Sequence, residues 1–184
     1  MSVFAAAGTL GDLSEWRLTN LEMQKTLYVA QMIHLGRTKQ PLFAECFEAW
    51  EYGPVVPALY HVVKQAGRDP ICPFTTDRLS PGTSECHALF DAFAMTRHLT
   101  PGQLISYTHR PGGAWEQYFV PFGRSRVIPN TSIQTEFEAF MMPSDEAVAW
   151  AEEMADEVEK SPSTYLAPEN ERAFGSRVLS ARFH

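Results

Sequence analysis

The chain has 184 residues, of which 45% are hydrophobic and 20% charged, and its formal net charge is −7. These proportions are typical of a globular chain and exclude wholesale disorder and fibrous repeats. No apolar run approaches the roughly 18 residues that span a bilayer, and the first residues lack the basic flank of a signal peptide. Three cysteines without paired spacing favour reduced thiols in the cytoplasm.

The negative charge is unevenly distributed. Residues 1–143 carry a net charge of −2, residues 144–160 carry −6, and residues 161–184 carry +1. Binding to nucleic acid usually needs clustered Lys and Arg that displace counterions from phosphates, and no such cluster is visible. The charge therefore argues against a nucleic-acid partner, we expect no membrane partner, and a basic protein partner fits the charge better.

The first part of the chain predicts a loose arm followed by a long helix. We expect residues 1–17 to form the arm. Thr19 and Glu22 have the spacing of a capping box, which opens a helix that ends at Gly36. Apolar residues occur on two sides of this helix, so much of it should be buried. Lys25 lies beside one apolar stripe and must either snorkel to solvent or find an anion.

Short elements separated by Gly and Pro should follow. We expect a short helix over residues 43–50, an extended link at Gly53 and Pro54, and a helix over 57–66. Residues 68–83 predict a long connection with room for one short strand. A helix over 84–98 comes next, and the capping-box pair Thr100 and Gln103 opens another helix that ends near His109.

The last part combines irregular chain with helices. Residues 110–130 are rich in Gly, Pro and aromatic residues, and 126–128 predict a short edge strand. A helix should cover 131–141, and an acidic amphipathic helix over 144–160 should pack on the domain, followed by an irregular tail over 161–184. The fold class is therefore mainly α, a compact six- to seven-helix domain with at most a small two- or three-stranded β element.

Three motifs resemble a known family. They are Leu21-x-x-Gln24-Lys25-x-Leu27-Tyr28, then Pro41-Leu42-Phe43, and then the string Glu48-Ala49-Trp50-x-Tyr52-Gly53-Pro54-Val55-Val56-Pro57-x-Leu59-Tyr60. This pattern is similar to the Panacea domain of SocA-like antitoxins, and the resemblance covers about residues 18–140, within an expected domain over 18–143. It implies an antitoxin that binds a cognate protein toxin, and it also implies a possible adaptor role that delivers the toxin to a ClpXP-type protease.

The motif residues have two interpretations. Aromatic residues at helical spacing usually build a core, so the Gly-Pro corner could be an internal hinge. Alternatively, the corner presents Tyr52 and its neighbours to the partner. The candidate partner-binding residues are Lys25, Tyr28, Glu48, Trp50, Tyr52, Gly53, Pro54, Tyr60 and Trp115. We also expect an ion pair between Lys25 and Glu48, each on its own helix.

No pattern indicates catalysis or a cofactor. Cys46 has no local nucleophile signature, and Cys72, Cys86 and His87 lack the spacing of a zinc site. We therefore expect no catalytic residue, no metal and no cofactor. Two alternatives stay open: a hydrolase with an unrecognised site around Cys46 or His109, and a DNA-binding autorepressor.

Overall fold

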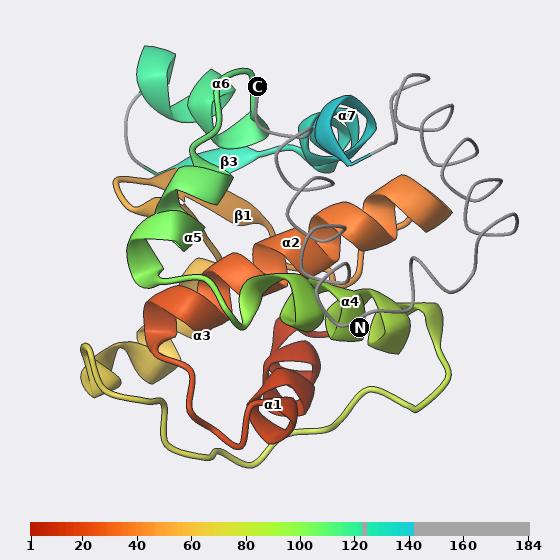
Figure 1. Ribbon diagram of the computed structural model, residues 1–184, viewed down its shortest axis with the longest axis vertical. Helices are drawn as coiled ribbons and strands as arrows, with labels where there is room; N and C mark the ends of the chain where they lie inside the picture. Colours follow the sequence, from red (N-terminus) through yellow and green to blue (C-terminus); the bar gives the residue numbers. More distant parts are fainter. Residues whose placement is uncertain (123–124, 142–184) are drawn as a thin grey trace, which may run out of the picture. The chain divides into compact units, whose positions relative to one another are not determined.

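A long helix that is buried along most of its length, α2 (Asn20–Thr38), makes its main contacts with four other helices and one strand of the described residues in this computed structural model (Figure 1). The structure describes residues 1–122 and 125–141. Residues 1–139 form one compact unit, and the remaining unit lies almost wholly outside the described residues. The expected acidic helix over 144–160 and the tail over 161–184 also lie outside them.

The mainly α fold class is confirmed. In the described part of the chain, α2 is joined by α1 (Val3–Leu13), α3 (Pro57–Val63), the 3₁₀ helix η1 (Lys64–Ala66), α4 (Ser84–Thr96), α5 (Pro101–Thr108), α6 (Ala114–Phe122) and α7 (Asn130–Phe140). The strands are β1 (Phe47–Trp50), β2 (Gly53–Val55) and β3 (Arg126–Ile128). They form one antiparallel sheet in the order β2-β1-β3, so β3 is an edge strand as expected.

The N-terminal residues are not a loose arm; that expectation is wrong. Ser2 caps α1, and the carboxylate of Glu45 accepts a hydrogen bond from Val3 N at 2.9 Å. The run of alanines brings α1 close to its neighbours, and Val3 and Leu10 are completely buried. A run of small residues resembles a flexible arm, but it also lets a helix approach others closely.

Helix α2 starts as predicted and ends later than predicted. The capping box of Thr19 and Glu22 is present, and the helix continues to a left-handed Lys39. Gly36 therefore lies inside the helix, where a Cβ would stand 2.1 Å from the ring of Phe137 on α7. The glycine serves close packing of α7 rather than the end of the helix.

Three further expectations differ from the structure. Residues 47–50 form strand β1 instead of the end of a helix, and residues 114–122 form α6 where irregular chain was expected. The connection over 68–83 holds no strand, only an isolated bridge between Thr19 and Pro70. By contrast, the helices starting at Pro57, Ser84 and Pro101 are confirmed, with the second capping box at Thr100.

Candidate functional site

The hairpin between β1 and β2 meets α2 at a corner where the position of Gly53 leaves no room for a Cβ atom. Gly53 has a φ of +99°, and a Cβ there would lie 2.7 Å from Lys25 Nζ and 2.9 Å from Thr108 Oγ1. The Nζ of Lys25 donates a hydrogen bond to the carbonyl oxygen of Pro54 at 3.1 Å. The Gly-Pro pair thus holds the hairpin against the buried lysine, with α5 on its other side.

Lys25 is only 1% exposed, so it does not snorkel to solvent. Burial lowers the pKa of its ammonium group to about 7. The expected ion pair between Lys25 and Glu48 is wrong: Glu48 instead accepts a hydrogen bond from Trp50 Nε1 at 2.9 Å. The reason is strand alternation, because Phe47 and Ala49 are buried on the inner face and Glu48 points to the other face.

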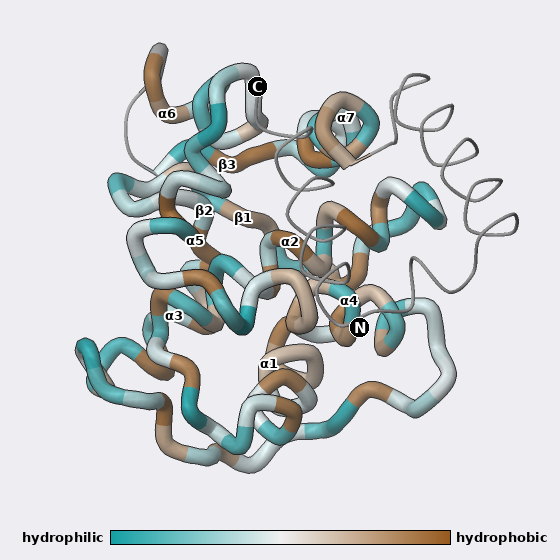
Figure 2. The backbone as a smooth tube through the Cα atoms, in the orientation of Figure 1, coloured by the Kyte–Doolittle hydropathy of each residue, from teal (hydrophilic) through white to brown (hydrophobic). Residues whose placement is uncertain are grey.

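Neighbouring Gln24 holds the far end of β2. Its Oε1 accepts from Val56 N at 2.9 Å, and its Nε2 donates to Val56 O at 3.5 Å. The side chain is 1% exposed. Hydrophilic residues recur along α2 in Figure 2 although the helix is buried, because these side chains satisfy backbone groups of the surrounding segments. The sequence singled out Gln24 as part of the motif but not as a site residue.

A second polar cluster joins α2 to α7 and to the start of α6. The carboxylate of Glu136 accepts from Tyr28 Oη at 2.5 Å and from Ala114 N at 2.9 Å. Its other oxygen lies 3.4 Å from Nε of Arg110. Burial is the main cause that raises the pKa of Tyr28 well above its usual value, and the charge of Glu136 adds to it. No local pattern identifies Glu136, which is 108 positions from Tyr28.

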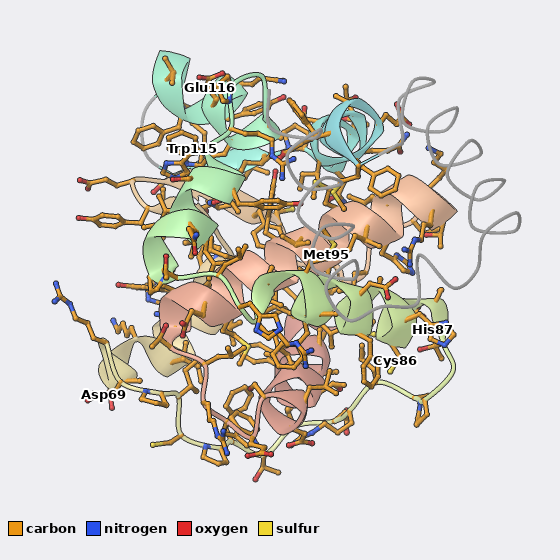
Figure 3. All side chains as sticks on the ribbon, viewed as in Figure 1. Asp69, Cys86, His87, Met95, Trp115 and Glu116 are labelled. Atoms are coloured by element: carbon orange, nitrogen blue, oxygen red, sulfur yellow. The ribbon has the colours of Figure 1, made fainter. Side chains whose placement is uncertain are left out.

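An aromatic stack connects the two clusters. Trp115 Nε1 donates to the backbone oxygen of Trp50 at 2.7 Å, and the indole lies between the rings of His109 and Phe119, with centroid distances of 3.5 and 4.7 Å. Figure 3 shows Trp115 at the α6 end that faces α5. Burial and then the charge of Lys25 lower the pKa of His109 to about 4, so its imidazole is neutral at neutral pH.

The candidate partner-binding residues therefore divide by accessibility. Lys25, Tyr28, Gly53, Pro54 and Trp115 are buried, and Lys25, Gly53, Pro54 and Trp115 shape the corner, as the hinge interpretation expects. Glu48, Trp50 and Tyr60 are half-buried, and the rings of Trp50 and Tyr60 pack edge to face at 4.9 Å. Tyr52 is 63% exposed at the hairpin tip. In the folded state, a partner can reach only the last four directly.

The surroundings of Cys46 and of the candidate metal ligands bear on the hydrolase and metal alternatives. Cys46 is exposed, and no hydrogen bond in this part of the chain connects it with a base. Over the same residues, no three His, Cys, Asp or Glu side chains are close enough together to hold a metal ion. No helix there is both long and apolar enough to cross a bilayer.

Comparison with known proteins identifies the family. Residues 23–116, just over half of the chain, match the family described as "Antitoxin SocA-like, Panacea domain". The chain is also similar to a protein described as Antitoxin SocA from Caulobacter vibrioides (strain NA1000 / CB15N), with 30% identity over 110 residues. That match covers 54% of this chain and 58% of the relative. No solved structure matches. The matched region contains the corner from α2 to the start of α6, and the chain belongs to the SocA-like antitoxin family with a Panacea domain.

Proposed function

We propose that the chain is an antitoxin that neutralises a cognate protein toxin by direct contact and carries out no reaction of its own. The observation that carries this proposal is the family match over residues 23–116. This region includes all nine candidate partner-binding residues, both the buried ones and those that a partner can reach.

The arrangement of the corner suits a binding role. Buried side chains of α2 hold the hairpin, and Trp115 of α6 donates a hydrogen bond to the backbone of Trp50. A surface that is rigid before binding loses little conformational entropy when a partner docks. The corner is therefore a support, and the half-buried and exposed residues around it are the ones available for contact.

A growth assay tests the role. The open reading frame beside this gene is expressed alone and then together with the full chain. We expect growth arrest in the first case and restored growth in the second. If the neighbouring protein is harmless, or remains toxic when the chain is present, the antitoxin proposal fails.

The same assay separates occlusion from delivery to a protease. Under occlusion, the toxin stays abundant while growth is restored. Under adaptor action, the toxin disappears, and it reappears in a strain that lacks the ClpXP-type protease. A chain that lacks residues 161–184 should bind the toxin but not promote its loss if the tail is the adaptor's tether. The assay thus distinguishes occlusion of the toxin from its delivery to the protease. We propose that the chain acts in the cytoplasm, where that protease works.

A further inference from the structure

The small sheet has two different faces, which the strand register assigns. Glu48 is paired with Val55 on one side and Val127 on the other, so these three side chains share a face. Trp50, two positions after Glu48, lies on the same face. We call the set of Glu48, Trp50, Val55 and Val127 the outer sheet face. The opposite face holds Phe47, Ala49 and Ile128, each at most 1% exposed.

The outer sheet face is only partly covered in the described structure. Helix α3 packs Tyr60 against Trp50, and Val55 is 7% exposed. Val127 at the edge of the sheet is 50% exposed, and Tyr52 at the adjoining hairpin tip is 63% exposed. Single exposed apolar residues are ordinary, but here Val127 is paired with Glu48 of the same face, and Tyr52 follows the half-buried Trp50 by two positions. Tyr and Trp are also the residues that most often dominate binding energy at interfaces.

Three contacts of Trp50 hold this face in place. The backbone oxygen of Trp50 accepts a hydrogen bond from Trp115. The ring of Trp50 packs on Tyr60, and the Nε1 of Trp50 donates a hydrogen bond to Glu48. The hydrogen bond from Trp50 places the Glu48 carboxylate beside the indole. Both groups are therefore in position before any partner arrives, which favours binding.

The charge of the face indicates what kind of partner it fits. Of its four side chains only Glu48 is charged, and no salt bridge within the described residues neutralises it. An arginine from a partner could pair with this carboxylate and stack on the adjacent indole, because a guanidinium does both. Aliphatic side chains next to that arginine would cover Val127 and Tyr52.

We infer that the outer sheet face, together with Tyr52, is the surface that grips the toxin, and that the toxin segment docked there presents an arginine among aliphatic side chains. This inference rests on the proposed antitoxin function. It assigns the contact to residues that a partner can reach and leaves Lys25 and the other buried motif residues in a supporting role.

The test measures the affinity of the purified full chain for the purified polypeptide encoded by the neighbouring open reading frame. Val127→Lys places a cation on the outer sheet face, and Val127→Glu places an anion of similar size at the same exposed position. We expect Val127→Lys to weaken binding about tenfold or more and Val127→Glu to weaken it much less. Phe90→Lys, at a 47% exposed position on α4, is the matched control and should bind like the wild type.

A second variant keeps the test informative if a change in β3 impairs folding. Tyr52→Ala removes a side chain that is mostly in solvent, so the protein should fold while its affinity falls about tenfold. Thermal unfolding of every variant checks the fold. Wild-type affinity for both Val127→Lys and Tyr52→Ala would overturn the assignment of the surface, and equal losses for Val127→Lys and Val127→Glu would overturn the basic partner. If the wild-type chain itself does not bind, the antitoxin proposal fails first.

Discussion

Replacement of the buried Lys25 by methionine should stabilise the protein near neutral pH. Methionine has a similar length and no charge, so the substitution removes the cost of burying an ammonium group that, among the described residues, donates a hydrogen bond to Pro54 alone. It also leaves the Pro54 carbonyl without its donor, which costs about 1–3 kcal/mol. The net effect therefore depends on how strongly Lys25 is destabilised at the pH of the measurement.

The lowered pKa gives the magnitude. Folded Lys25 loses its proton at a pH of about 7, whereas the unfolded lysine has a pKa of 10.5. Folding therefore releases a proton between these values, and stability rises with pH. The destabilising contribution is fully present below pH 7, where it approaches ~5 kcal/mol, and it disappears as the pH rises to 10.5. Between pH 7 and pH 9.5 the wild type should gain about 3 kcal/mol relative to Lys25→Met.

Urea unfolding at pH 7, 8, 9 and 9.5 measures this difference. The interval avoids His109, whose lowered pKa makes stability fall as the pH drops from 6.5 to about 4. It also avoids Tyr28, whose raised pKa makes stability fall above the ordinary tyrosine value of 10.0. Lys64→Met, at an exposed lysine, is the control for the loss of a lysine side chain.

The expected result is a stabilised Lys25→Met protein at pH 7 whose advantage over the wild type is nearly gone at pH 9.5. If the free-energy difference between the two proteins is the same at every pH, the lysine does not have a lowered pKa. In that case the reasoning that its ammonium group is desolvated is refuted. If the variant is less stable at pH 7, the hydrogen bond to Pro54 outweighs the cost of burial.

Three further substitutions test the packing around α2 by urea unfolding. Gly53→Ala should cost about 2 kcal/mol more than Gly82→Ala, because both glycines have positive φ but only the first is crowded, by Lys25 and Thr108; equal costs would show that the corner has room. Gly36→Ala should destabilise the protein by about 1–3 kcal/mol through a clash with a ring of α7. Its control, Gly102→Ala, lies in open space on α5 and should stabilise the protein by a few tenths to about 1 kcal/mol. A gain in stability at both positions would contradict the close approach of α7. Glu136→Gln should cost about 3 kcal/mol, since it removes the buried negative charge that faces Arg110; an unchanged midpoint would mean that this ion pair contributes nothing.

The sequence alone predicted the features that depend on neighbouring residues. The capping boxes at Thr19 and Thr100, Pro57 at the start of α3, and the short edge strand over 126–128 all follow from local patterns, and the structure confirms each. The motif around the Gly-Pro corner also identifies the correct family.

Only the tertiary structure decided which residues meet across the chain. The burial of α1, the place of Gly36 inside a helix, and the contact of Glu136 with Tyr28 depend on segments far apart in sequence. The expected pair of Lys25 and Glu48 failed because residues 47–50 form a strand, and a strand turns alternate side chains to opposite faces. In a helix, Glu48 would lie on a different face relative to Phe47 and Ala49. No local signal in residues 47–50 distinguished a helix from a strand.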